Sequence, residues 1–309
     1  MTQDQRDHGG GLDAAVARWG GTRDDWIDLS TGINPEPYPI EKISLSAWTA
    51  LPDHGAQDRL IAAARNFWNV PDTAAVLAAP GASALIARIP MLAPRGRVQI
   101  DGPTYNEHAA AFEIAGWEAG HGEAMVVVHP NNPDGRLWDA ESLTAPFTII
   151  DESFCDIAPQ HSLIGLAKRP GTIVLKSFGK FWGLAGLRLG FAIGDPALIK
   201  TLADYLGPWP VSGPALEVGA KALQDHAWAE ATRARLAQDA KRLDKMMRPH
   251  GPLVGGTDLF RLYDVGDAAA FQTRLAKAQI WSRIFPYSTS WIRLGLPSSN
   301  DWSRLETAL

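Results

Sequence analysis

Short apolar runs that alternate with helical patterns constrain the fold of this chain more than any other feature. Between about residues 56 and 194, β-rich runs are separated by stretches with helical periodicity. Two of these runs, Val126-Val127-Val128 and Thr148-Ile149-Ile150, lack the apolar–polar alternation of half-exposed strands. Such runs are typical of strands buried on both faces of a parallel sheet. The sequence therefore predicts an α/β fold, a mostly parallel sheet with helices on both faces.

The expected elements fall into a large lobe and a small one. Strands are expected at 97–101, 125–129, 147–151, 172–176 and 190–194, and helices at 56–68, 82–92, 106–115 and 162–167. After three prolines at positions 208, 210 and 214, an Ala-rich segment with spaced leucines runs to Pro249, which predicts one long helix linking two lobes. A strand at 259–263, a helix at 268–278 and strands at 281–284 and 291–294 indicate a small α+β lobe.

These patterns predict three regions. Residues 1–44 are expected to form an N-terminal arm and part of the small lobe, residues 45–214 the large domain, and residues 215–309 the linking helix and small C-terminal domain. With 309 residues and 46% hydrophobic content, the chain can bury a large core.

Composition narrows the kind of ligand and the compartment. A net charge of -5 without a run of Lys or Arg argues against nucleic acid or an anionic membrane surface, so a small ligand is expected. The single cysteine, Cys155, excludes an internal disulfide, and the chain starts with polar residues. No apolar run approaches the roughly 18 residues that a membrane span needs. We therefore expect a cytoplasmic protein.

Polar residues follow several of the expected strands directly. In open parallel sheets, ligands bind beyond the carboxyl ends of the strands, so these residues are the first candidates for a site. The segments are Pro80-Gly81-Ala82-Ser83, Pro130-Asn131-Asn132-Pro133, Asp151-Glu152-Ser153-Phe154 and Lys176-Ser177-Phe178-Gly179-Lys180, the last followed by Gly183-Leu184-Ala185-Gly186-Leu187-Arg188.

Together these segments resemble the fold-type I pyridoxal-phosphate enzymes, the aminotransferase class I/II family. The most specific element places a serine, a lysine and an arginine at offsets of three and eight residues, Ser177, Lys180 and Arg188. The resemblance runs from about His8 to Pro297, and it implies pyridoxal 5'-phosphate as the cofactor. No metal ligand set is predicted.

The resemblance assigns the two central catalytic roles. Lys180 would form the Schiff base with the cofactor and later move protons on and off the substrate carbon. Asp151 would keep the pyridine nitrogen protonated, so that the ring accepts the electron pair released from the substrate. A buried carboxylate needs such a partner, because it is costly when unpaired.

Further residues are predicted to bind the cofactor. A phosphate needs backbone N–H groups at a helix start and a fixed cation. Asn132 is expected to donate to the phenolic oxygen, and Tyr105 to stack on the pyridine ring. The predicted phosphate ligands are Gly81, Ala82, Ser83, Ser177 and Arg188.

Two features near the amino end narrow the substrate. His8-Gly9-Gly10 and Asp28-Leu29-Ser30-Thr31-Gly32-Ile33-Asn34-Pro35 are similar to segments of the cobalamin-pathway threonine-phosphate decarboxylases, and Gly179 before the lysine agrees with that branch. The resemblance implies decarboxylation of L-threonine O-3-phosphate to (R)-1-aminopropan-2-ol O-2-phosphate.

A phosphorylated amino acid has two anionic groups, and the predicted small lobe offers two arginines. Arg293, on a short apolar strand, would grip the α-carboxylate, and Arg283 the phosphate. Asn34 and His8 would line the same pocket.

Alternatives stay open. Histidinol-phosphate aminotransferases also bind a phosphorylated amine and use the same lysine and aspartate, so a PLP-dependent aminotransferase is the second reading. A cofactor-binding scaffold or regulator without turnover is the third. Phe154 and Leu51 replace tyrosines that many relatives carry, one beside the cofactor and one reaching the partner subunit. A homodimer is still what the resemblance implies.

Overall fold

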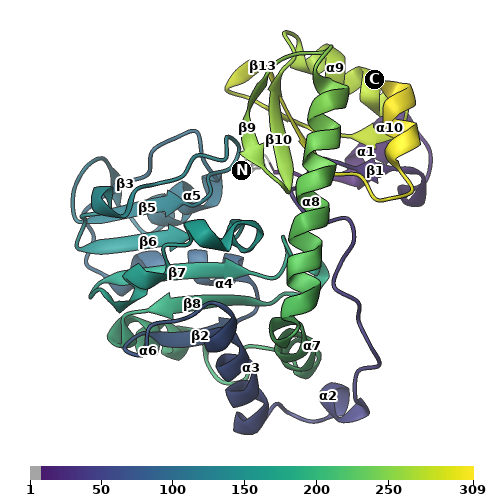
Figure 1. The fold of residues 1–309 in the computed structure, drawn as a ribbon. Coiled ribbons are helices and arrows are strands. Elements are labelled where there is room, and N and C mark those ends of the chain that lie inside the picture. Colours follow the sequence, from purple (N-terminus) through teal and green to yellow (C-terminus); the bar gives the residue numbers. More distant parts are fainter. Residues whose placement is uncertain (1–7) are drawn as a thin grey trace. The chain divides into compact units, whose positions relative to one another are not determined.

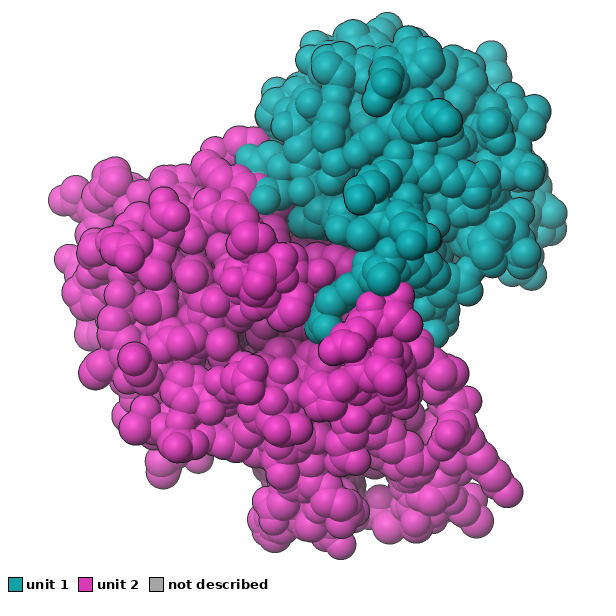
Figure 2. Space-filling model, in the orientation of Figure 1, with its two compact units in different colours: residues 1–37, 133–135, 232–309 teal, residues 38–132, 136–231 magenta. Residues whose placement is uncertain are grey.

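The computed structural model of the protein describes residues 8–309 and consists of two compact units (Figures 1 and 2). Unit 1 comprises Met1–Pro37, Pro133–Gly135 and Thr232–Leu309, and unit 2 comprises Tyr38–Asn132 and Arg136–Ala231. The boundaries expected from the sequence lie after residues 44 and 214, whereas the units change after Pro37 and Ala231.

Unit 2 is built around a seven-stranded sheet in the order β2-β8-β7-β6-β5-β3-β4 (Figure 1). Strands β3 to β7 pair in parallel, and β8 is antiparallel to both of its neighbours. The predicted α/β fold class, with its mostly parallel sheet, is confirmed. The strands are β2 (Ala75–Ala79), β3 (Arg97–Gln99), β4 (Glu118–Ala119), β5 (Ala124–Val128), β6 (Phe147–Asp151), β7 (Thr172–Ser177) and β8 (Gly190–Gly194).

The middle of this sheet is the core of unit 2. Every residue of β5, β6 and β8 is buried, as the non-alternating apolar runs predict. Ile149 and Ile173 pair across β6 and β7 and are both fully buried. The sheet therefore gives the loops at its ends a rigid base.

The reversed direction of β8 decides which loops meet. Gly190, its first residue, pairs with Ser177 at the end of β7 and with Ala79 at the end of β2. The loops after β2, β5, β6 and β7 and the loop before β8 therefore lie along one edge of the sheet, the edge where the sequence places its candidate residues.

Helices of unit 2 start at clear caps. The side chain of Asp53 accepts from Ala56 N at the start of α3, and Ser212 caps α7 in the same way. The expected helix 82–92 is two shorter pieces, α4 and η2. The helices are α2 (Leu45–Thr49), α3 (His54–Phe67), α4 (Ala82–Ile86), η2 (Ile89–Leu92), α5 (Asn106–Ile114), η3 (Ala140–Ser142), η4 (Cys155–Ile157), η5 (Pro159–His161), η6 (Ile164–Lys168), η7 (Ala185–Leu187), α6 (Pro196–Leu206) and α7 (Gly213–Gln224).

The prediction of a single long helix before Pro249 is wrong, because the segment forms two helices. Helix α7 ends at Gln224, and α8 (His226–Met247) begins after Asp225. Asp225 leaves the helical conformation, and its carboxylate accepts from Trp228 N at 3.0 Å. An aspartate that caps the next helix interrupts the first, although the apolar spacing continues across it.

Unit 1 contains two small sheets. One has the order β12-β13-β10-β9 and is antiparallel, and the other pairs β1 with β11 in parallel. The remaining elements are α1 (Leu12–Trp19), η1 (Arg23–Asp25), β1 (Ile27–Asp28), β9 (Leu253–Thr257), β10 (Phe260–Asp264), α9 (Ala268–Lys277), β11 (Ile280–Trp281), β12 (Arg283–Phe285), β13 (Ser288–Gly295) and α10 (Trp302–Ala308). Among residues 8–309, no helix has both the length and the apolar character to cross a membrane.

Candidate active site

Asp151 is the last residue of β6 and is 2% exposed. His108 Nε2 lies 2.8 Å from its Oδ2, and the Ser153 hydroxyl and N–H donate to Oδ1 at 2.5 and 3.0 Å. Burial alone would raise the pKa of Asp151, but these hydrogen bonds outweigh burial and lower the pKa. The structure therefore holds a buried, ionised carboxylate at the edge of the sheet.

Lys180 follows the next strand, β7, and is half-buried. Its Nζ lies 5.2 Å from the ring centroid of Phe154, and Gly183 N donates to its carbonyl at 3.1 Å, which closes a turn. Asp151 pairs with Leu175 across β6 and β7, so the lysine turn begins beside the carboxylate's strand. An anionic carboxylate thus ends one strand, and an amine follows the adjacent strand.

A glycine-lined corner forms where β2 and β8 meet. A Cβ at Gly81, whose φ is +87°, would collide with the Arg188 guanidinium, and a Cβ at Gly190 would collide with the backbone of Ala82. Arg188 Nη2 approaches Ser83 Oγ at 3.4 Å. The structure brings the predicted set together here: Gly81, Ala82, Ser83, Ser177 and Arg188.

Two loops that carry predicted residues are tied to each other. Thr104 Oγ1 donates to Asn131 Oδ1 at 2.6 Å, and Asn131 Nδ2 donates to the Pro103 carbonyl at 3.0 Å. These bonds fix the loop before α5, which carries Tyr105, against the loop after β5, which carries Asn132. The Tyr105 ring lies edge-on to His108 at 6.1 Å.

In unit 1, Arg293 and Arg283 are directly opposed partners on β13 and β12. Arg293 is 5% exposed, and its Nη2 donates to the Ser30 carbonyl at 2.6 Å. Burial, together with the positive charge of Arg283, lowers the pKa of Arg293 to about 10. Gly9 lies beside this guanidinium and against Ser30, so the glycine-rich N-terminal segment and the segment around Ser30 meet at Arg293.

Asn34 and His8 differ in their surroundings. Asn34 is buried, and its Oδ1 accepts from Arg235 Nη2 at 2.6 Å and from Glu36 N at 3.1 Å. His8 is exposed at the start of the described chain, next to Gly9. Arg235, on α8, is absent from the predicted set, since nothing in its helical context distinguishes it from a solvated arginine.

Behind the sheet edge, His129, Glu152 and Cys155 place possible metal-ligating atoms within 4.8 Å of one another. Trp138 N donates to His129 Nδ1 at 3.0 Å, and His129 Nε2 lies 2.6 Å from the His161 carbonyl. The Lys176 ammonium lies 2.6 Å from Glu152 Oε2. Because a cation of the protein already faces Glu152 and both imidazole nitrogens are engaged, this cluster is a hydrogen-bonded network of the core.

His108 and Ser153 are the contacts of Asp151 that were not predicted. A signal for His108 was present, because Tyr105 and His108 are three residues apart at a helix start and so share a face. Ser153 lies two residues after Asp151, a spacing that suits a local side-chain bond.

The family model described as "Aminotransferase class I and II" matches residues 117–309. The chain belongs to this family. Within the family, a threonine-phosphate decarboxylase of Pseudomonas aeruginosa is 40% identical, across 98% of this chain and 97% of that protein. A histidinol-phosphate aminotransferase of Vibrio campbellii is 32% identical over 42% of this chain and 41% of its own.

A solved structure shares the fold of this chain. The histidinol-phosphate aminotransferase from Sinorhizobium meliloti, in complex with pyridoxal-5'-phosphate, has a TM-score of 0.81 and 17% identity, with 99% of this chain and 95% of that chain covered. This likeness shows the fold alone.

Like its family, the protein is a pyridoxal-phosphate-dependent enzyme. The observed residues fit this cofactor. The corner at Gly81 has a guanidinium and hydroxyl groups but no room for a side chain, which suits a phosphate. The buried anionic Asp151 suits a protonated ring nitrogen, and Lys180 offers an amine one strand away.

Proposed function

We propose that the protein decarboxylates L-threonine O-3-phosphate to (R)-1-aminopropan-2-ol O-2-phosphate and CO₂, in cobalamin biosynthesis. The observation that carries this proposal is the 40% identity, over 98% of the chain, to a threonine-phosphate decarboxylase. Relatives named histidinol-phosphate aminotransferases match only part of the chain, which makes an aminotransferase the second candidate.

Lys180 and Asp151 do the central chemistry in this proposal. The cofactor, when bound, supplies an aldehyde for the substrate amine and a ring that accepts the electron pair left when CO₂ departs. Asp151 holds the proton on the ring nitrogen, and His108 keeps Asp151 ionised. Lys180 would hold the cofactor between turnovers. With substrate bound in its place, the released Lys180 ammonium would donate a proton to Cα once the bond from Cα to the carboxylate has broken.

The remaining unit 2 residues hold the cofactor in place. Ser83, Ser177 and Arg188, with the backbone of Gly81 and Ala82, bind its phosphate. Tyr105 stacks on the ring, and Asn132 donates to the phenolic oxygen. With Phe154 in place of tyrosine, Asn132 is the main donor we assign to that oxygen.

Substrate anions are assigned to unit 1. Arg293 binds the carboxylate and Arg283 the phosphate, with His8 and Asn34 lining the pocket. Support comes from the direct opposition of the two arginines, because a buried cation facing another cation is stabilised when an anion binds.

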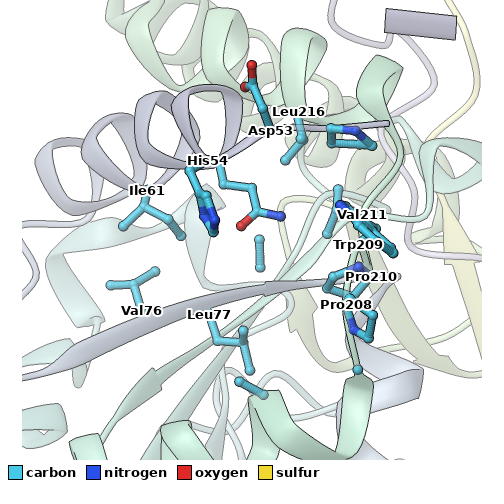
Figure 3. A pocket seen from close by; sticks show the side chains of 15 residues that line it. Asp53, His54, Ile61, Val76, Leu77, Pro208, Trp209, Pro210, Val211 and Leu216 are labelled. Atoms are coloured by element: carbon cyan, nitrogen blue, oxygen red, sulfur yellow. The ribbon is translucent and has the colours of Figure 1, made fainter. Parts of the chain in front are cut away.

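We also propose a homodimer in the cytoplasm. Unit 2 carries two hollows of about 410 Å³ each, and both are lined by Pro52, Asp53 and Leu216. Figure 3 shows the first of them. Trp209 borders the first hollow and is 54% exposed, and Leu51 borders the second and is 69% exposed.

Trp48, on α2, is 66% exposed, and its neighbour Ala47 lines the second hollow. Protruding apolar side chains beside apolar hollows on one surface suit a self-complementary contact with a second copy. The single cysteine is a buried thiol, which agrees with a reducing compartment.

Two parallel incubations test the function. Purified holoenzyme is supplied with L-threonine O-3-phosphate without an amino acceptor, and CO₂ and the amine product are measured. A second sample receives histidinol phosphate and 2-oxoglutarate. We expect CO₂ release in the first and no transamination in the second. Acceptor-dependent loss of histidinol phosphate, without CO₂ from the first sample, would instead make the protein an aminotransferase.

A further inference from the structure

Lys180 is flanked in the sequence by two aromatic residues that stack on each other. The rings of Phe178 and Trp182 have centroids 5.1 Å apart and planes 11° apart, and both side chains are fully buried. Gly183 N donates to the Lys180 carbonyl. The lysine therefore stands on a short turn whose two sides are held by a stacked, buried pair of rings.

The Trp182 ring is anchored by a carboxylate that the proposed chemistry does not use. Its indole N–H donates to Asp156 Oδ2 at 3.0 Å, and the indole of Trp68 donates to Asp156 Oδ1 at 2.8 Å. Asp156 is 3% exposed. Each oxygen of one buried carboxylate thus accepts an indole N–H, so the direction of both rings is fixed.

The charge of Asp156 is balanced inside the same network. Lys176 Nζ lies 3.5 Å from Asp156 Oδ1 and 2.6 Å from Glu152 Oε2. Burial opposes the charge on Lys176, but the two carboxylates outweigh burial and raise its pKa. Removing one partner from such a network leaves a buried charge or donor unsatisfied, which is strongly unfavourable. The network is therefore rigid.

A residue from a different element also stacks on the Trp182 ring. Trp228, near the start of α8, stacks on Trp182 with centroids 5.3 Å and planes 13° apart. If the Trp182 indole tilted, it would lose both the bond to Asp156 and this stacking. The turn that carries Lys180 inherits that restraint, because Trp182 lies within it.

We propose that Asp156 is a positioning residue that acts on Lys180 through the indole of Trp182. The inference rests on the proposed role of Lys180 as the cofactor lysine. Small displacements of a reacting amine cost catalysis heavily, so a fixed turn has a direct use. Trp68 uses the other oxygen of the same carboxylate but follows α3, outside the lysine turn.

Trp182→Phe and Trp68→Phe form a matched pair, since each removes one indole N–H from Asp156 and leaves an aromatic ring. For the holoenzyme we measure the release rate of the cofactor, the visible circular dichroism of the bound cofactor, and kcat and KM.

Trp182→Phe is expected to speed cofactor release and lower kcat, each by about tenfold, the size of one charge-assisted hydrogen bond, and to weaken the dichroism. KM is expected to change less than about twofold. Trp68→Phe is expected to leave all four quantities within about twofold of the wild type.

Equal changes in both variants, or no change in either, would overturn the proposal. Should Trp182→Phe fail to fold, Asp156→Asn serves instead. Trp68 and Lys176 both face Oδ1 and would hold the single acceptor oxygen of the amide there, which leaves an amide N–H opposite the Trp182 indole, so this variant should reproduce the faster cofactor release. Unchanged release in Asp156→Asn would equally contradict the inference. Release rate and dichroism need no substrate, so they test Asp156 even if the decarboxylase assignment fails.

Discussion

Arg283 and Arg293 face each other as directly opposed residues on the antiparallel strands β12 and β13. Like charges at opposed positions destabilise a sheet, and here the charge of Arg283 helps burial to lower the pKa of Arg293. The fold carries a repulsion that an anionic ligand would relieve.

Replacing Arg283 by glutamine should therefore separate stability from function. We expect KM for L-threonine O-3-phosphate to rise about 10- to 100-fold, as for the loss of one charge-assisted contact, while cofactor affinity is unchanged. The melting temperature without substrate should stay level or rise, because the repulsion is gone. Arg274→Gln, which removes an exposed charge on α9, is the control and should alter neither quantity. An unchanged KM in Arg283→Gln would refute the phosphate assignment.

The attachment of the cofactor can be mapped chemically. Borohydride reduction of the holoenzyme should fix the cofactor to one peptide, and mass spectrometry should locate it at Lys180. Lys180→Ala should carry no fixed cofactor and should lose activity by at least about a thousandfold. Lys200→Ala, which removes an amine 79% exposed on α6, should behave as the wild type. Label on any other lysine would count against the assignment.

Much of the site follows from where polar residues leave the strands. Asp151 ends β6 and Lys180 follows β7, and strands buried on both faces are legible in the sequence because their apolar runs do not alternate. Parallel neighbours then bring such residues to one edge without further information.

Other parts could not be predicted, because they depend on the register of distant segments. Asp156 binds indoles that lie 88 and 26 residues away, and no local spacing encodes that meeting. Strand β2 was not predicted, because Ala75–Ala79 is mostly alanine, a residue with weak strand preference. The end of α7 was not predicted, because the apolar spacing typical of a helix continues past Asp225, where the helix stops.

The hydrogen bond from His108 to Asp151 predicts how stability responds to acid. Asp151 has a lowered pKa in the fold, so its contribution to stability is present above the unfolded value of about 3.9 and is lost as pH falls through the folded pKa. In His108→Phe, burial is no longer offset by that bond and should raise the pKa of Asp151. The contribution of Asp151 to stability then changes with pH in the opposite direction. The variant should regain stability from this carboxyl group as pH falls through its raised pKa towards about 4.

Urea unfolding of the apoprotein between about pH 7 and pH 3 measures this difference. The comparison is repeated in the Asp151→Asn background, where the group no longer titrates. The stability difference between the wild type and His108→Phe should narrow as pH falls, and this pH dependence of the difference should vanish in the background variant. Parallel slopes in all four proteins would mean that His108 does not set the charge of Asp151.

The surface of unit 2 around Trp209 leads to a test of the proposed dimer. Trp209 has φ +53°, a left-handed conformation that costs a residue with a side chain roughly 1–2 kcal/mol and costs glycine little. Trp209 is nevertheless 54% exposed beside the hollow in Figure 3. Trp209→Gly should therefore keep or raise the stability of the monomer while it weakens self-association.

Sedimentation equilibrium at micromolar concentration distinguishes these effects. We expect the wild type to be a dimer and Trp209→Gly to dissociate at least about tenfold more readily, as for the loss of one interface aromatic. Ile114→Ser, which removes an apolar side chain 80% exposed outside both hollows, should not change the association. A monomeric wild type would contradict the proposal that a second copy of the chain covers this surface. A dimer equally strong in Trp209→Gly would place its contact elsewhere, because an interface built on this loop loses its largest exposed aromatic ring in that variant.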